Sequence, residues 1–363
     1  MTKMYTCIEI FPVELWLEIF RYLTCKHIAL AFGRLNSFFD SILSSPQLPT
    51  IIRVRIGFAP ACPSAQNFEK SSALKIEWIQ ALDTYETKRS GCIIPFLQNY
   101  ASRLINMRVL NVYIRAKHAE SKLFRLCKAL PQLHRLEVLN LNCKRNFIDK
   151  SLSNSIGELF TTILQHRNLR NCSLSLWNLQ ETTFDRQYVL DLPLNHSIRN
   201  LRIDNIERRI LFDIIPYFRG LQSLGVQYQT QGYIFDQTDM SYPIQSLSLP
   251  ALSRLKLSIC NLTFQRLELI CNATDGCLCH LDVDYSVYVF TNHYEDYLDY
   301  FDRARWAKLL ESVAVAHVDV RIHALDAVSK DIISNIAKND PSIKWNENRT
   351  VSSYASLTIK KSN

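Results

Sequence analysis

The sequence has 363 residues, 47% of them hydrophobic, and its 42 Lys and Arg outnumber 34 Asp and Glu to give a net charge of +8. This length fits two or three ordinary domains, or one short domain followed by an extended array. No run of about 18 apolar residues occurs, and Glu9, Glu14 and Glu18 interrupt the region where a secretory signal would be apolar. We therefore expect no membrane partner and a location in the cytoplasm, the nucleus or both.

Glycine is scarce, with eight residues in the chain. Loops that cradle phosphate groups need clustered glycines, because the backbone must approach the ligand closely, and no G-x-G pattern is present. Neither G-x-S-x-G nor H-E-x-x-H occurs. The composition predicts a binding protein without a catalytic site or a cofactor, rather than an enzyme.

Eleven cysteines are spread along the chain, and free thiols are the expected state in a reducing compartment. One group, formed by Cys260, Cys271, Cys277, Cys279 and His280, offers four thiols and an imidazole to a zinc ion. The group lacks the paired C-x-x-C spacing of zinc knuckles. We predict buried structural thiols and no metal, with a zinc site as the alternative.

The first 45 residues favour a small helical unit. Residues 11–23, FPVELWLEIFRYL, place Leu15, Ile19 and Leu23 four residues apart, which makes an apolar stripe along a helix. Pro12 suits the first helical turn, where its missing N–H would have no partner.

Two more short helices are expected, at residues 28–32 and over the apolar face of Leu35, Phe38, Phe39, Ile42 and Leu43. Three helices in fewer than 45 residues cannot bury much surface by themselves. The unit therefore either caps the following domain or presents an exposed apolar face to a partner.

Residues 11–43 also follow a known pattern. The segments F-P-V-E-L-x-x-E-I-F-x-Y-L, I-A-L-A-F and L-N-S-F-F-D-S-I-L resemble an F-box, which opens Leu-Pro-x-Glu-Leu/Ile, continues with apolar residues at helical spacing and ends near an aromatic that is commonly Trp. Phe11 stands where Leu is usual, Phe39 stands near the usual Trp, and residues 24–26 lack the common Asp of the first turn. The resemblance covers roughly a tenth of the chain.

This resemblance implies a role. F-box proteins are substrate receptors of SCF-type ubiquitin ligases, in which the F-box docks onto a small adaptor that links it to a cullin, and the receptor performs no chemistry itself. Carried over by position, the resemblance implies that Phe11, Pro12, Leu15, Ile19 and Leu23 bind the adaptor. The alternative for each residue is a place in the core of the helical unit.

The rest of the chain repeats an L-x-x-L-x-L template. From the fourth position of the first match, Leu110, to that of the last, Leu281, the six steps average 28.5 residues, and such recurrence is typical of repeat proteins. The matches predict strands at residues 107–112, 136–141, 169–174, 198–203, 221–226, 252–257 and 278–283.

The segments between these strands predict helices, because their apolar residues lie on one helix face. They are residues 120–130, 151–167, 207–219 and 264–273. Alternating strands and helices favour parallel strands joined by right-handed crossovers, with each unit stacked on the next. The pattern resembles a degenerate leucine-rich repeat. We expect an α/β fold in which a three-helix F-box at residues 1–45 precedes an irregular leucine-rich-repeat-like solenoid, with parallel strands and outer helices, at residues 46–363.

The expected solenoid also has ends. Ile51–Ile56 is a candidate for an additional first strand, and residues 315–323 with a helix at 326–338 form a candidate closing unit. The stretch after Asn346 is polar, and we expect it to be loosely held.

Charge is distributed unevenly. Residues 101–150 hold 11 Lys and Arg against 3 Asp and Glu, which suits an acidic partner or nucleic acid, but basic residues opposite an apolar face are typical of any solvated helix, and we do not expect nucleic-acid binding. The acidic aromatic run at residues 292–302 contains His293, Glu295, Asp296 and Asp299. We favour a solvated helix N-terminus for this run over a metal site.

The template also predicts a binding face. Its fourth and sixth positions point into the core, so the third, fifth and seventh positions line the opposite, concave face. The C-terminal units place charged residues there, namely Arg202, Arg254, Lys256, His280, Asp282 and Asp284. Charged groups on such a face set selectivity, so we expect a protein substrate to bind them. The alternative is that Arg254 and Lys256 pair with Asp282 and Asp284 across neighbouring strands.

Together these patterns predict the substrate receptor of an SCF-type ubiquitin ligase, whose partners are the ligase adaptor, a cullin reached through it, and a protein substrate. The alternative is a stand-alone repeat scaffold or a nucleic-acid-associated binding protein.

Overall fold

The computed structural model describes residues 10–23, 28, 31–32, 35–43, 53–56, 76–84, 93–115, 119–144, 152–176, 192–204, 211, 213–227, 247–260, 263–287, 298–315, 317–324, 327–340, 343–346 and 353–360. The chain divides into two compact units, Met1–Leu169 (unit 1) and Arg170–Asn363 (unit 2). Both units contain strands and helices, and most strand pairs are parallel, so the predicted α/β class is confirmed.

The described residues at the start of unit 1 include the short helices α1 (Val13–Arg21) and α3 (Ser37–Leu43). Pro12 has an extended backbone and lies directly before α1, where its missing N–H costs no hydrogen bond. The side chain of Asn36 caps α3 by accepting a hydrogen bond of 3.0 Å from the backbone N–H of Phe39. Of the helix expected at residues 28–32, only residues 28, 31 and 32 are described, and they are helical. The boundary predicted near residue 45 lies outside the described residues and stays a prediction.

The sheet of unit 1 has four parallel strands in chain order, which are β1 (Arg53–Ile56), β2 (Ala81–Thr84), β3 (Val109–Arg115) and β4 (Val138–Lys144). Side-chain amides fix the register on one face of the sheet: Asn111 donates a hydrogen bond to the carboxylate of Asp83, and Asn140 donates to the amide oxygen of Asn111 at 2.6 Å. The residues of this ladder are 28 and 29 positions apart, which matches the repeat expected from the sequence.

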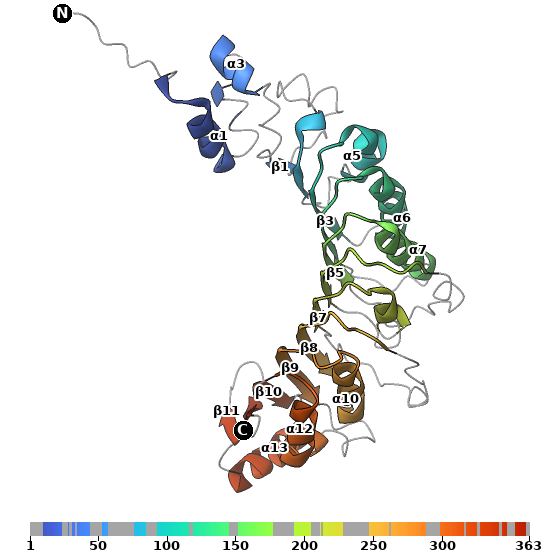
Figure 1. Cartoon of the computed structure of the whole chain (residues 1–363), viewed down its shortest axis with the longest axis vertical. Coiled ribbons are helices and arrows are strands. Elements are labelled where there is room, and N and C mark those ends of the chain that lie inside the picture. The colour runs from blue at the N-terminus through green and yellow to red at the C-terminus, as the bar shows by residue number, and fades with distance from the viewer. Residues whose placement is uncertain are drawn as a thin grey trace, which may run out of the picture. The chain divides into compact units, whose positions relative to one another are not determined.

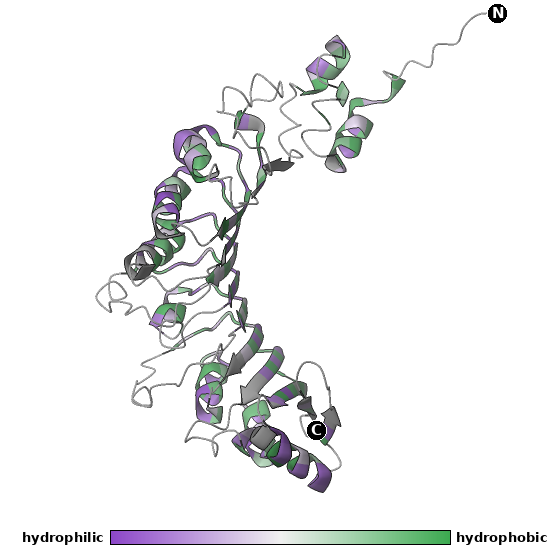
Figure 2. Cartoon of the chain, turned by 180° about the vertical axis from the view of Figure 1, so that it is seen from behind, coloured by the Kyte–Doolittle hydropathy of each residue, from purple (hydrophilic) through white to green (hydrophobic). Residues whose placement is uncertain are grey.

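Three helices lie along one side of these strands, namely α5 (Ile93–Tyr100), α6 (Ala119–Ala129) and α7 (Leu152–Gln165) (Figure 1). Their apolar residues face the strands, and hydrophilic residues lie on the side away from them (Figure 2). Short 3₁₀ turns precede some strands and are η3 (Ile76–Trp78), η4 (Ala101–Arg103) and η5 (Leu130–Gln132). The helices expected at residues 120–130 and 151–167 are confirmed by α6 and α7.

The sheet of unit 2 is parallel over its first six strands and antiparallel at its end. The parallel strands are β5 (Asn171–Leu176), β6 (Asn200–Asp204), β7 (Ser223–Gln227), β8 (Arg254–Cys260), β9 (His280–Val287) and β10 (His317–Ala324). Two further strands, β11 (Ile343–Asn346) and β12 (Ser353–Lys360), close the sheet in the order β10-β12-β11.

In the described part of unit 2, the helices with defined bounds include α10 (Phe264–Asn272), α12 (Arg303–Glu311) and α13 (Ala327–Asn339), with 3₁₀ turns η7 (Ile215–Tyr217) and η9 (Asp299–Phe301). The helices expected at 264–273 and 326–338 are confirmed by α10 and α13. The prediction of a helix over residues 207–219 was wrong in part. In the described residues of that segment, the short 3₁₀ turn η7, which contains Pro216, takes the place of the expected end of the helix.

The repeat template accounts for the core. All seven predicted strands are present, and each begins at the third template position. The first, fourth and sixth positions are buried in every repeat, as in Leu252, Leu255 and Leu257. Side chains alternate between the two faces of a strand, so the remaining positions lie on the opposite face. Leucine and other apolar residues at these positions therefore specify both the strand and the face that it buries.

One expectation about the C-terminal end needs correction, and another holds in part. The polar stretch after Asn346 contains β12, which pairs with β10 along eight residues and buries Ala355. The acidic aromatic run at 292–302 is described only from residue 298, and there Tyr300 is fully buried against Phe264 and Trp306. Leu298 and Asp302 are exposed, and the Asp302 side chain caps α12 by accepting hydrogen bonds from the backbone N–H groups of Ala304 and Arg305. The run therefore ends at a solvated helix N-terminus, as expected, but it also supplies Tyr300 to the core.

Candidate functional site

The predicted adaptor-binding residues lie on the solvent side of α1. Phe11 is 49% exposed and Leu15 is 41% exposed, Pro12 is exposed, and Ile19 and Leu23 are half-buried. Two large apolar residues that the sequence did not single out, Ile10 and Tyr22, are also exposed, as is Leu35, which was expected on the third helix. The term N-terminal apolar face is used below for Ile10, Phe11, Pro12, Leu15 and Tyr22.

The opposite side of α1 forms a core. Trp16 is 4% exposed, Leu17 and Phe20 are buried as well, and the Trp16 ring lies 4.9 Å from the ring of Phe39 on α3 and 5.5 Å from that of Phe32. These edge-on aromatic contacts hold α1 and α3 together. Because Trp16 and Phe20 fill the core, the alternative that places Phe11 and Leu15 inside it does not hold in the structure.

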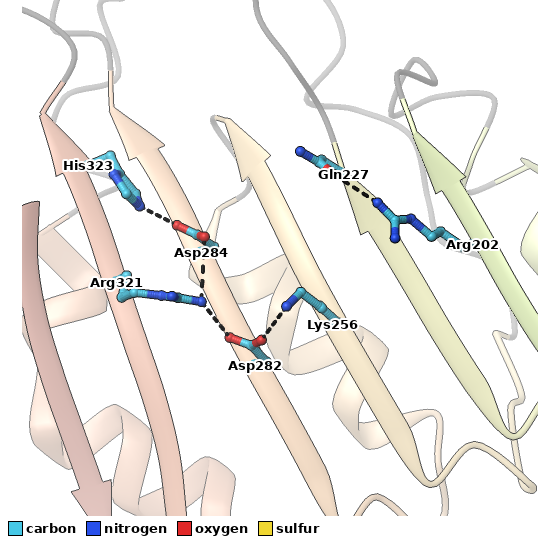
Figure 3. Close-up of polar contacts among 7 residues, drawn as sticks. All are labelled: Arg202, Gln227, Lys256, Asp282, Asp284, Arg321 and His323. Carbon is cyan, nitrogen blue, oxygen red and sulfur yellow. Dashed lines mark hydrogen bonds and ion pairs between the residues drawn. The ribbon is translucent and has the colours of Figure 1, made fainter. Parts of the chain in front are cut away.

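A second surface lies on the face of the unit 2 sheet opposite the helices, which Figure 3 shows with its charged side chains. The strands β6 to β10 alternate buried and accessible residues, and the predicted residues Arg202, Arg254, Lys256 and His280 are exposed there while Asp282 and Asp284 are half-buried. The sequence placed these residues on one face, and the strand register confirms this, pairing Arg254 with His280 and Lys256 with Asp282.

Charges on this helix-free face form a chain across three strands. Lys256 Nζ lies 2.9 Å from Asp282 Oδ2, and Arg321 contacts Asp282 at 3.4 Å and Asp284 at 3.6 Å. His323 Nε2 lies 2.5 Å from Asp284 Oδ1 (Figure 3). Arg321 and His323 were missed, although the alternation of residues 318–323, VDVRIH, contained the signal.

The position of Asp284 in this chain changes its acidity. Burial would raise the pKa of the carboxyl group, but the hydrogen bond and charge of His323, followed by the charges of Arg321 and Lys256, outweigh burial and lower the pKa. Asp284 is therefore held in its charged form.

The pairing alternative holds for only one of the two basic residues. Lys256 pairs with Asp282 as that alternative predicts, whereas Arg254 has no ion pair or hydrogen bond to its side chain from the described part of the chain. Arg202 is held on its own side of the face, with Nε 3.1 Å from Asp204 and a terminal nitrogen donating to Gln227 at 3.3 Å (Figure 3). His280 contacts the Cys279 thiol at 3.3 Å.

The cysteines of the possible zinc group are not in one place. Cys271 is buried, and its burial raises the pKa of the thiol to about 12, while Cys277 and Cys279 are exposed. The side chain of Cys260 is outside the described residues. Within the described ranges, no three His, Cys, Asp or Glu residues are grouped so that they would hold a metal ion.

A metal site in the acidic run would need His293, Glu295 and Asp296, and these three residues lie outside the part of the chain that the structure describes. Asp299 is described and forms an ion pair with Arg305, which also contacts Glu268 at 3.2 Å. This pairing fixes η9 against α10 and α12.

No protein-family model matches this chain, and no curated protein is similar to it. In the part of the chain that the structure describes, no helix is both long and apolar enough to cross a bilayer.

Proposed function

We propose that this protein is the non-catalytic substrate-receptor subunit of an SCF-type ubiquitin ligase. The N-terminal apolar face binds the ligase adaptor, and through it a cullin, and the helix-free face of the repeat region binds a protein substrate. One observation carries the proposal: Phe11 and Leu15 are exposed although Trp16 and Phe20 on the same short segment are buried.

A helix that is apolar on two sides has more apolar surface than its own unit can cover. The aromatic contacts of Trp16 with Phe32 and Phe39 fix the orientation of α1, so Phe11 and Leu15 are presented to solvent in a defined arrangement. Exposed apolar groups held in this way favour a partner, because little conformational entropy is lost on binding. The F-box resemblance identifies the partner, since the residues that it assigns to the adaptor include these two.

The repeat region supports the second half of the proposal. Its strands follow a leucine template that resembles a degenerate leucine-rich repeat, and the accessible template positions carry polar and charged side chains. Repeat scaffolds of this kind present extended faces to partners. The charged residues of β6 to β10 are therefore available for substrate selection rather than for core packing.

The proposal is tested with the full chain and a purified SCF adaptor. The double variant Pro12→Ala and Leu15→Ala removes apolar contact area from the N-terminal apolar face, and we expect the adaptor affinity to fall about 100-fold, because a few buried anchors carry most of a small interface. Thermal unfolding should stay unchanged, since Leu15 lies outside the core of α1.

The matched control is Phe124→Ala, which truncates an exposed aromatic residue on α6 and should leave adaptor affinity unchanged. Equal adaptor affinity of the double variant and the original protein would overturn the docking assignment. An original protein that does not bind the adaptor at all would favour the stand-alone repeat scaffold.

A further inference from the structure

Three cations surround a glycine on the helix-free face of unit 2. The register places Arg202 of β6, Gly225 of β7 and Lys256 of β8 in one row across three neighbouring strands. Arg254 lies on the same face of β8, one row away and opposite Ser223. The term basic notch is used below for Arg202, Gly225, Arg254 and Lys256.

The glycine leaves space between the cations. Among the described residues, a Cβ atom built at Gly225 would have the Arg202 side chain near it, with Cγ at 3.8 Å and Cβ at 3.9 Å, which are ordinary van der Waals distances. The backbone conformation of Gly225 therefore does not require glycine, and the missing side chain leaves room for another group to approach β7. Such a close approach is a common reason for glycine within a strand.

The charges of the basic notch are only partly compensated. Arg254 has no charged partner in the described residues, and Lys256 has Asp282, which it shares with Arg321. Arg202 has Asp204 at 3.1 Å, yet its side chain stays exposed. In the described residues, Lys256 acts on Asp284 as well as on Asp282, and Arg321 is drawn to both. The four cations Arg202, Arg254, Lys256 and Arg321 therefore share three carboxylates, those of Asp204, Asp282 and Asp284. Because these cations outnumber the carboxylates near them, an anionic group that binds here would gain cationic partners whose charge is not fully neutralised.

We propose that the basic notch binds one anionic group, a carboxylate or a phosphate, carried by an extended segment of a protein partner. Naming that partner as the ligase substrate rests on the proposed function, but the binding itself does not. A single anion fits because Arg guanidinium groups bind carboxylate and phosphate oxygens with two parallel hydrogen bonds.

A peptide suits this face better than a nucleic acid. The carboxylates of Asp204, Asp282 and Asp284 flank the basic notch on the same face and would repel the evenly spaced phosphates of a polynucleotide. A peptide can place one acidic residue over the notch and basic or neutral residues over the carboxylates. This alternation of sign gives the face an orientation preference for its partner.

The test uses the full chain to select binders from a random-sequence peptide display library. We expect the enriched peptides to share one acidic position and to bind about equally when phosphoserine replaces the acidic residue. Arg254→Glu should weaken their binding about ten-fold or more, as expected for the loss of a charge-assisted hydrogen bond and the added repulsion. Gly225→Leu should abolish peptide binding, because its side chain would fill the space between the cations. Gly225→Ala is the folding control, which checks that β7 accepts a side chain at this position.

The matched control is Arg125→Glu, which makes the same charge change on α6 and should leave peptide binding unaltered. The proposal is overturned if the library yields no binders, if enriched peptides show no acidic preference, or if Gly225→Leu binds them as well as the original. Binding of a single-stranded oligonucleotide that is lost in the same variants would also overturn it, in favour of nucleic acid. The Pro12→Ala and Leu15→Ala double variant should still bind the peptides. The adaptor assay and the peptide assay therefore test the two proposals independently, and either proposal can fail without the other.

Discussion

Lys256 on β8 holds its ammonium nitrogen 2.9 Å from the carboxylate of Asp282 on the adjacent strand β9. The two side chains are 63% and 38% exposed, so water screens their attraction and the pair adds little to the stability of the fold. Asp282 also attracts Arg321, at 3.4 Å. Lys256 can therefore exchange its partner for an incoming anion at a small cost in free energy, which fits a binding surface better than a structural ion pair.

The neighbouring carboxylate, Asp284, should make the free energy of unfolding depend on pH in the acid range. Its pKa is lower in the folded protein than in the unfolded chain, so the unfolded chain binds the proton more readily. The stabilisation by charged Asp284 is full above about pH 4 and is lost as the pH falls through the lowered folded pKa.

We expect Asp284→Asn to lower the free energy of unfolding at pH 7 and to reduce its dependence on pH in the acid range. Urea denaturation at a series of pH values between neutral and acid measures both effects. A variant whose acid dependence is as steep as that of the original would show that Asp284 does not carry this stabilisation.

Two glycines in unit 2 should respond in opposite ways to an added methyl group. A Cβ atom at Gly220 would lie 2.3 Å from the backbone oxygen of His196, and a backbone atom cannot move away as a side chain end can. We expect Gly220→Ala to lower the free energy of unfolding by about 2 kcal/mol or more. Gly225→Ala meets only van der Waals contacts, so its effect should stay within about 0.5 kcal/mol.

Chemical denaturation of the two variants side by side measures this difference. A Gly220→Ala protein that is as stable as Gly225→Ala would mean that the backbone of His196 does not approach Gly220 as closely as the structure places it. The comparison also checks that the basic notch tolerates the substitutions used to test it.

The parallel strands could be predicted because leucines at three template positions mark both a strand and its buried face. The strand β2, with the sequence ALDT, has too few apolar residues to show a period, and β12 lies in a polar stretch. Their places are set by pairing with distant strands, as β12 pairs with β10. Hydrophobic periodicity in one sequence predicts which residues of a strand are buried, but it does not predict which distant strand pairs with it.

The two surfaces differ in how far the sequence could define them. Alternation along β8 and β9 was enough to place Lys256 and Asp282 on one face. It was not enough to show that Arg321 joins them, because β10 lacks the leucines of the template that would fix its register with β9. On α1 both sides are apolar, so the stripe of Leu15 and Ile19 could equally have been the buried one. Only the packing of Trp16 and Phe20 against α3 decides which side is left to solvent.

A buried histidine in unit 1 should add a second pH effect, at higher pH. His166 donates a hydrogen bond from Nε2 to the backbone oxygen of Leu133 at 3.0 Å. Burial lowers the pKa of His166, and the charge of His134 lowers it further, although the Leu133 oxygen opposes the change. The unfolded chain therefore binds this proton more readily, and the folded state loses stability as the pH falls below about 6.5.

We expect the free energy of unfolding to decrease between pH 7 and pH 5, and His166→Gln to remove part of that decrease while its amide still reaches the Leu133 oxygen. Denaturant titrations of both proteins at these pH values measure the difference. His196→Gln is a suitable control, because it removes an exposed histidine that does not contribute to the lowered pKa of His166. Identical pH profiles for His166→Gln and the original would contradict the assignment.

Thiol reactivity should divide the described cysteines into two classes. Burial raises the pKa of Cys127, Cys172 and Cys271 to about 12, with the nearby charges of Glu158 on Cys127 and Glu268 on Cys271 as further causes, so these thiols stay protonated and out of contact with reagent.

Cys277 and Cys279 are exposed and should be the described cysteines that a maleimide labels first in the native protein. Mass spectrometry after brief labelling identifies the modified residues, and the Cys277→Ser and Cys279→Ser double variant should lose the corresponding labels. A zinc site would need Cys271, Cys277 and Cys279 to bind one ion together, but Cys271 is buried whereas the other two are exposed. We therefore also expect elemental analysis of the purified protein to find no stoichiometric zinc. One equivalent of zinc that protects Cys277 and Cys279 from the maleimide, and that is lost in the double variant, would instead establish the metal site that the spacing of these residues argues against.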